Sequence, residues 1–231
     1  MRSFLFVGDS MTIGCPGDFT WRYRMWQHLE ASGDAYEIVG PRTALYDPVA
    51  AAPTSHAYAA DDFPAAARRH LAGWGEGWLH MAPAIRSAVE STGADTLLVS
   101  LGLIDLGFYT NATQTAANLD LFLTEARAAH PHVSIAIHPV IPNVRAERDA
   151  PFAAECARFN ELLAKTVADR DEPRSPILLA TPHPTYDIHA DTYDGTHPGP
   201  TGEHKLAAAF ADAMHQAWGV GAAYSSNHEF A

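Results

Sequence analysis

The alternation of short apolar runs with longer amphipathic segments is the feature of this sequence that most constrains its fold. The candidate strands are Ser3–Val7, Tyr36–Val39, Thr96–Leu101, Val133–His138 and Ile177–Ala180. The candidate helices are Thr20–Ala31, Glu76–Glu90, Thr113–Ala129, Pro151–Ala168 and Pro200–Trp218. Such alternation is typical of a parallel sheet covered by helices on both faces. It predicts an α/β fold, a three-layer α/β/α sandwich around a five-stranded parallel sheet.

The pattern runs without a linker or repeat, so we predict one domain over residues 1–218. Residues 219–231 are mostly small or polar, and we expect them to form a flexible tail. The segment Pro41–Leu71 shows no clear periodicity. Loops of this length in a compact domain usually act as lids or binding loops, so we expect this one to serve a specialised substrate.

Charge and composition exclude several functional classes. The chain has 27 acidic against 15 basic residues and a net charge of −12. Nucleic-acid binding depends on basic residues that neutralise phosphates, so nucleic acid is not an expected partner. No stretch approaches the roughly 18 apolar residues of a membrane-spanning helix, and we predict no membrane insertion.

The two cysteines, Cys15 and Cys156, are too few for a disulfide framework and lack the spacing of a zinc site. Cys156 falls on the apolar face of a predicted helix, which indicates a core position. The first apolar run, Phe4–Val7, is too short for a signal peptide. We therefore predict free thiols and a cytoplasmic protein.

A serine near glycines, Ser10 in the segment Gly8–Gly14, follows the first predicted strand. Open α/β folds bind their ligands at the carboxyl ends of the strands, which makes Ser10 a candidate nucleophile. The simpler interpretation is a strand-to-helix turn in which Ser10 caps the helix. The glycine spacing does not fit the G-x-G-x-x-G dinucleotide fingerprint.

A second polar motif, Asp194 with His197, lies on a turn rich in glycine and proline. A serine hydroxyl needs an adjacent base, and that base needs a group that orients it. Ser10, His197 and Asp194 supply these three roles. A metal-dependent hydrolase is the alternative, because further candidate ligands precede His197: His183, Asp187, His189 and Asp191. No H-E-x-x-H or comparable helical spacing is present, so we predict no metal ion and no cofactor.

From about Phe4 to Trp218, these motifs and their order resemble the SGNH, or GDSL-type, esterase and lipase family. Gly8-Asp9-Ser10 resembles the first sequence block of the family, and the segment Asp194–Pro198 resembles the last. The resemblance implies a flavodoxin-like SGNH hydrolase fold. It also implies that Ser10 is the nucleophile, His197 the base and Asp194 its orienting acid, with the Ser10 backbone N–H in the oxyanion hole.

By the same resemblance, the second block supplies a glycine N–H to the oxyanion hole. The segment His70–Glu76 offers Gly75, with Gly73 as the alternate. Four tryptophans either line an acyl pocket or pack helix faces: Trp21, Trp26, Trp74 and Trp78.

The third block departs from the family pattern. Gly-x-Asn-Asp is expected after the third strand, but the chain has Ile104 before Asp105, where the asparagine should donate to the oxyanion. Three explanations stay open: another donor such as Asn111 or Asn143, a more activated acyl group, or a reaction other than hydrolysis. We expect Asp9 and Ile104 to contact substrate, and Asp105 to form structural hydrogen bonds.

The sequence thus predicts a serine hydrolase that cleaves an ester or thioester of a small molecule through an acyl-enzyme. An acyltransferase or cyclase with the same triad is the alternative. So is a catalytically silent binding module of the same fold. The sequence gives no prediction of the oligomeric state.

Overall fold

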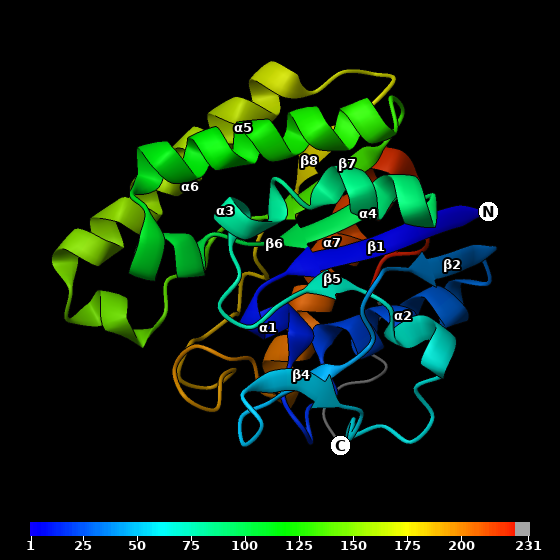
Figure 1. The fold of residues 1–231 in the computed structure, drawn as a ribbon, viewed down its shortest axis with the longest axis horizontal. Coiled ribbons are helices and arrows are strands. Elements are labelled where there is room, and N and C mark those ends of the chain that lie inside the picture. The colour runs from blue at the N-terminus through cyan, green and yellow to red at the C-terminus, as the bar shows by residue number, and fades with distance from the viewer. Residues whose placement is uncertain (225–231) are drawn as a thin grey trace.

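The computed structural model describes residues 1–224 and confirms the α/β fold, with one mostly parallel sheet (Figure 1). The strand order is β2-β1-β6-β7-β8, and a short further strand, β5 (Leu71–Ala72), pairs with β1. The sheet therefore has six strands and not the five expected. The other strands are β1 (Arg2–Gly8), β2 (Tyr36–Val39), β6 (Thr96–Ser100), β7 (Ser134–His138) and β8 (Ile177–Leu179). All neighbouring pairs are parallel. The strands expected from the sequence are therefore present, with ends that differ by at most one residue.

Two helical layers cover the sheet. Successive side chains of a strand point to opposite faces, so Leu5 and Val7 enter one core while Phe4 and Phe6 enter the other. The first core is closed by α3 (Trp78–Met81), α4 (Ile85–Thr92), α5 (Ala112–Ala129) and α6 (Ala150–Arg170), and the second by α2 (Trp21–Ser32) and α7 (Pro200–Trp218). Figure 1 shows α5 and α6 running side by side on the upper side of the sheet.

The prediction of a single helix over Glu76–Glu90 is wrong, because the structure has two helices there, α3 and α4. Pro83 lies between them, and proline has no N–H for the helical hydrogen bond that a continuous helix needs there. Three further short helical turns carry no clear sequence period: α1 (Ser10–Ile13), η2 (Asp105–Tyr109) and η3 (Val144–Glu147).

The segment Pro41–Leu71, which lacks a sequence period, contains regular structure in pieces too short to show one. These are the antiparallel pair β3 (Leu45–Asp47) and β4 (Ala52–Ser55), and the 3-10 helix η1 (Ala65–Arg68). The segment ends in β5 (Leu71–Ala72), which pairs with β1 at Val7 and Gly8 and so reaches the carboxyl edge of the sheet.

The first part of the segment expected to be a flexible tail packs on the domain. The Gly221 N–H donates to Asp34 Oδ2 at 3.2 Å, and the Tyr224 N–H donates to Asp212 Oδ1 at 2.8 Å. The Tyr224 ring also lies 5.2 Å from the His28 ring. The remainder of that expected tail, 225–231, lies outside the described residues.

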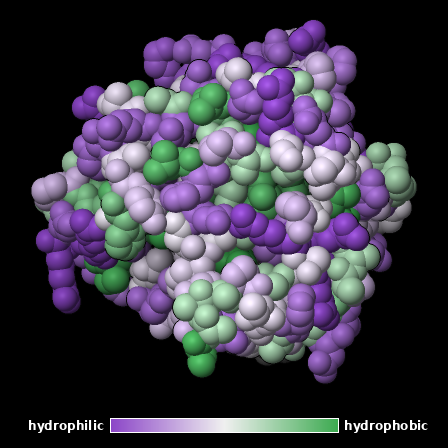
Figure 2. Space-filling model, viewed as in Figure 1, coloured by the Kyte–Doolittle hydropathy of each residue, from purple (hydrophilic) through white to green (hydrophobic). Residues whose placement is uncertain are grey.

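On the face drawn in Figure 2, hydrophilic and apolar residues are interspersed, with the apolar ones in small separate groups. Within residues 1–224, no helix is both long and apolar enough to cross a membrane.

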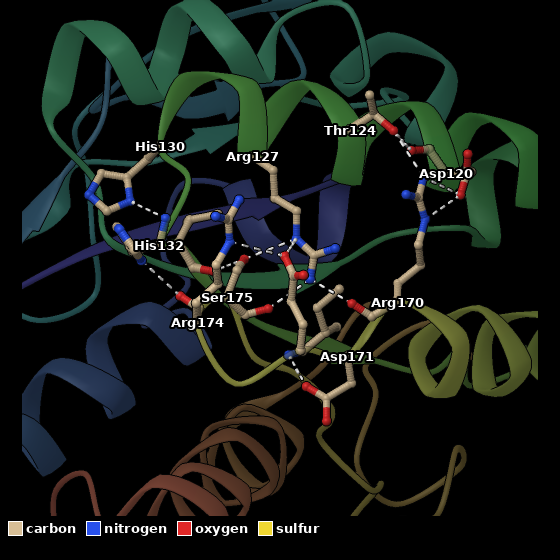
Figure 3. A network of polar contacts seen from close by, with 12 residues as sticks. Asp120, Thr124, Arg127, His130, His132, Arg170, Asp171, Arg174 and Ser175 are labelled. Carbon is tan, nitrogen blue, oxygen red and sulfur yellow. Dashed lines mark hydrogen bonds and ion pairs between the residues drawn. The ribbon is translucent and has the colours of Figure 1, made fainter.

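Arg127 organises a polar network where α5, α6 and the segment before β8 meet (Figure 3). Its guanidinium donates to the carbonyls of Arg170 and Ser175 at 2.6 and 2.7 Å, and to Ser175 Oγ at 3.0 Å. These residues lie near the amino end of β8. The network is therefore structural and lies at the edge of the sheet opposite to the carboxyl end of β1.

Arg127→Met is expected to lower the free energy of unfolding by about 2–3 kcal/mol, because it leaves two carbonyls without their donor. Urea unfolding measures this loss. Arg174→Met is the control, since the Arg174 side chain is 66% exposed and is expected to change stability by less than about 0.5 kcal/mol. Equal losses in the two variants would show that the network adds no stability.

Candidate active site

Ser10 is the first residue of α1, immediately beyond the carboxyl end of β1. The helix is capped by Asp9, whose Oδ1 accepts the Met11 N–H at 3.0 Å, so the capping role considered for Ser10 belongs to its neighbour. Gly8 is required by close packing, because a Cβ there would lie 2.0 Å from Thr12 Oγ1. The turn thus leaves the Ser10 hydroxyl available to another partner.

That partner is His197, 187 positions along the chain. Its Nε2 lies 2.9 Å from Ser10 Oγ, and its Nδ1 lies 2.6 Å from Asp194 Oδ2. The distances meet the hydrogen-bond requirement for a nucleophile, a base and an orienting acid. The Ser10 residue is 4% exposed, which limits the water around its hydroxyl.

The Asp194 carboxylate also shapes the turn that carries the base. Its Oδ1 accepts the N–H groups of Thr196 and His197 at 2.9 and 2.7 Å. Partial burial acts to raise the pKa of Asp194, but the hydrogen bonds from His197 and Thr196 outweigh it and hold that pKa below its usual value. The carboxylate is therefore ionised when it accepts from the imidazole.

The residues considered as metal ligands have other partners. Asp191 accepts from Lys205 Nζ at 2.7 Å and from Thr201 Oγ1 at 2.7 Å, and His189 Nε2 lies 2.6 Å from Glu147 Oε1. Across residues 1–224, no three His, Cys, Asp or Glu side chains are arranged to hold a metal ion.

A pocket of about 370 Å³ opens beside Ser10 and His197. Its walls are mostly apolar and come from five segments of the chain besides Ser10: Trp74–Gly75, Leu103–Ile104, Gly107–Tyr109, Asn143 with Arg145 and Phe152, and Thr196–His197. A larger hollow of about 850 Å³ lies beside β2 and η1. Neither Ser10 nor His197 lines this larger hollow, so the candidate active site is not in the larger of the two cavities.

Of the two glycines considered for the oxyanion hole, the geometry favours Gly75. The Gly73 N–H donates to the Gly8 carbonyl at 3.1 Å, whereas Gly75 lines the pocket at a φ of 73°, which favours glycine. The turn is held by an ion pair of 2.6 Å between Arg42 and Glu76. Arg42 thus connects the segment Pro41–Leu71 to the second block.

Ile104 lines the pocket, and its neighbour Asp105 is fully buried. The Asp105 carboxylate accepts the N–H groups of Trp78 and Leu79 at 2.8 and 3.0 Å. It therefore holds the start of α3, which is the structural role expected for it.

The two asparagines considered as replacement donors differ in position. Asn111 caps α5 by accepting the Gln114 N–H at 3.0 Å and does not line the pocket. Asn143 does line it, and its Nδ2 donates to Thr196 Oγ1 at 3.1 Å. An amide nitrogen carries two N–H groups, so Asn143 keeps a second donor.

The position of Asp9 does not fit the substrate contact expected for it, because that contact requires a place on the pocket wall. It is fully buried, does not line the pocket, and its Oδ2 has no hydrogen-bond partner. Burial raises the pKa of Asp9 to about 7, although the Met11 N–H opposes the shift, and nearby Asp105 adds to it. The structure therefore gives Asp9 a role in holding α1.

Among the four tryptophans, only Trp74 lines the pocket, while Trp21 and Trp78 are fully buried in the two cores. Sequence reasoning missed Phe108 and Arg145 on the pocket wall, because neither carries a motif or a periodic pattern.

His138 ends β7 at the same edge of the sheet and is buried, with no partner for Nε2. Burial lowers the pKa of His138 from 6.5 to about 4, although the Pro139 carbonyl opposes the shift. Below pH 6.5 the imidazole of His138 is therefore protonated in the unfolded chain, whereas in the folded protein it stays neutral down to about pH 4. As the pH falls from 6.5 to 4, this difference lowers the free energy of unfolding by about 3 kcal/mol.

His138→Gln removes this titration, so its stability deficit against the unmodified protein is expected to shrink between pH 7 and pH 4.5. Urea unfolding at a series of pH values measures the deficit. A deficit that stays constant across the series would contradict the assignment.

Comparisons with known proteins identify the family and the fold of this chain. The sequence model of the GDSL-like lipase/acylhydrolase family matches residues 6–205. A comparison with curated proteins found no significant match.

Among solved structures, an acetyl esterase mutant with an acetate ion has a TM-score of 0.70 at 21% identity, covering 90% of this chain and 93% of that one. A carbohydrate esterase of family 3 from Talaromyces cellulolyticus has a TM-score of 0.71 at 22% identity, covering 91% and 94%. A family 3 carbohydrate esterase from Clostridium thermocellum has a TM-score of 0.70 at 17% identity, covering 93% and 96%. The sandwich is thus the fold of SGNH esterases, and by the match over residues 6–205 the chain belongs to the GDSL-like lipase/acylhydrolase family.

Proposed function

We propose that this chain is a serine hydrolase that cleaves an ester or thioester of a small molecule. The observation that carries the proposal is the hydrogen-bonded series from Asp194 through His197 to Ser10 at the wall of a pocket. Family membership supports a hydrolase of acyl groups.

In the proposed mechanism, His197 Nε2 accepts the proton of Ser10 Oγ as that oxygen attacks the substrate carbonyl. The ionised Asp194 accepts from Nδ1–H and stabilises the imidazolium that forms. The N–H groups of Ser10 and Gly75 donate to the oxyanion. The leaving alcohol or thiol takes the proton from His197, and the acyl group stays on Ser10 Oγ until water, activated by His197, releases it as an acid.

Two observations support a small substrate. The pocket volume of about 370 Å³ lies at the lower end of the range for small-molecule sites. Structurally similar proteins include an acetyl esterase and two carbohydrate esterases, which favours a short acyl group on a polar alcohol such as a sugar. Acetyl esters of sugars are therefore the first substrates to test.

Acyl transfer with the same triad is the second candidate, favoured by Ile104. Its apolar side chain makes the pocket drier, which disfavours water more than a bound alcohol acceptor. The hydrogen-bonded series of Asp194, His197 and Ser10 argues against a catalytically silent binding module, because binding alone does not require it.

A fluorophosphonate probe tests the proposal directly. We expect a single adduct on Ser10, located by peptide mass spectrometry, and none on Ser10→Ala. Folded protein that reacts with no probe would favour the binding module. With an acetyl ester as donor, adding a sugar alcohol separates the two reactions: transfer yields a new ester, and hydrolysis yields only acetate.

Cys15 and Cys156 are both free thiols, which supports the proposal of a reducing, cytoplasmic compartment.

A further inference from the structure

The ring of His197 is stacked against two aromatic side chains. Trp74 stacks on it with ring centroids 4.8 Å apart and planes inclined by 17°. Tyr193 stacks on it with ring centroids 5.8 Å apart and planes inclined by 17°. Tyr46 continues the series, stacked on Trp74 at 4.7 Å and 14°. Four rings from three separate parts of the sequence are therefore connected by stacking contacts, and we call this group the ring column.

Backbone contacts hold the segments that carry the three rings stacked with His197 or with its neighbour. Trp74 stands between Gly73, whose N–H is bound to the Gly8 carbonyl, and Gly75, at the turn of the second block. Tyr46 belongs to β3, and its N–H donates to the Gly14 carbonyl at the end of α1 at 3.0 Å. The Tyr193 N–H donates to the His197 carbonyl at 3.1 Å.

The hydrogen-bond partners of His197 do not restrain every motion of its imidazole, and the ring column restrains the remaining one, a tilt out of the ring plane. Hydrogen bonds to Asp194 and Ser10 hold the two nitrogens in the plane of the imidazole, but they oppose tilting out of that plane only weakly. The stacked rings of Trp74 and Tyr193 oppose this tilting by contact. The faces also attract the ring once it is protonated, because an aromatic face carries partial negative charge.

We propose that Trp74 and Tyr193 are positioning residues that hold the His197 imidazole in line with Ser10 and stabilise it as a cation, with Tyr46 supporting Trp74. The proposal rests on the proposed function, in which His197 is the base. It also gives the segment Pro41–Leu71 a part in the site through Tyr46, although none of its residues lines the pocket.

Tyr193 allows the cleanest test. It is 56% exposed and does not line the pocket, so its removal creates no core cavity and takes away no pocket wall. Trp74, in contrast, lines the pocket, so its loss would mix substrate binding with positioning. Tyr46 stays outside the pocket and reaches His197 only through Trp74.

The experiment compares Tyr193→Leu, Tyr193→Phe and Tyr46→Leu with the unmodified protein on an activated acetyl ester. We expect Tyr193→Leu to lower kcat by about two- to fivefold with KM changed less than about twofold, because a cation–π contact at an exposed site is worth about 0.5–1 kcal/mol. Tyr193→Phe restores the aromatic face and should recover most of the loss. Tyr46→Leu should lower kcat by a smaller factor. Proton NMR should show the Nδ1–H signal of His197 broadened in Tyr193→Leu.

An unchanged kcat in Tyr193→Leu would overturn the proposal, and so would equal losses in the Leu and Phe variants, which would assign the effect to the hydroxyl. Melting temperatures of all three variants detect any loss of folding. If Tyr193→Leu is unstable, the kcat of Tyr46→Leu and the His197 Nδ1–H signal of that variant provide the test. The Ser10→Ala variant distinguishes failure of the proposed function from failure of the ring-column proposal. Full turnover in Ser10→Ala would refute the proposed function. An inactive Ser10→Ala together with an unchanged kcat in Tyr193→Leu would refute only the role of the ring column.

Discussion

Ser10→Ala and His197→Ala are each expected to lower kcat by about 10⁴-fold or more, and the double variant by no more than either single one. The reason is that Ser10 Oγ and His197 Nε2, 2.9 Å apart, act as one unit in the proton transfer. Losses that depend on the same step do not add. Asp194→Asn should be milder by about ten- to a hundredfold, since the base stays in place without its ionised partner.

The measurement is the steady-state hydrolysis of an activated acetyl ester, with circular dichroism and melting temperature as controls for folding. Fluorophosphonate labelling provides the second readout, because it depends on the nucleophile and not on substrate fit. Full turnover in Ser10→Ala, together with inhibition of the unmodified protein by chelators, would refute the serine mechanism and favour a metal-dependent hydrolase.

The sequence predicted those parts of the structure that depend on local patterns. Apolar runs placed five strands of the main sheet, since strands of a parallel sheet covered on both faces are mostly apolar. The spacing of Asp194 and His197 indicated a turn on which the two side chains meet, and the structure has that turn. Pro200 likewise marked the first residue of α7.

What the sequence could not predict depends on contacts between distant segments. The strands β3 and β4, with the sequences Leu-Tyr-Asp and Ala-Pro-Thr-Ser, are short and contain no apolar run, so their hairpin was not visible. Tyr46 meets Trp74 only after that hairpin docks against α1. Whether Asn111 or Asn143 faces the pocket follows from the turns before α5 and after β7, which no motif marks.

Ile104 leads to the second large expected effect. Ile104→Asn places an amide donor at the pocket wall, where the family pattern has one, and should raise kcat for activated acetyl esters. One well-placed donor to an oxyanion is worth about 10²–10³ in kcat, and this factor is the upper limit of the gain. Ile104→Leu is the matched control, because leucine has nearly the shape of asparagine without its N–H groups.

The size of the gain depends on whether Asn143 already acts as the donor. Its Nδ2 holds Thr196 Oγ1 at 3.1 Å and has a second N–H, and Asn143 lines the same pocket as Ser10. If Asn143 donates to the oxyanion, Asn143→Ala lowers kcat by at least tenfold and Ile104→Asn gives little gain in the unmodified protein. The double variant Asn143→Ala with Ile104→Asn then recovers part of the loss, because either amide serves the same oxygen. Additive effects would instead show that two separate donors act, and that the natural Ile104 leaves the oxyanion hole one hydrogen bond short.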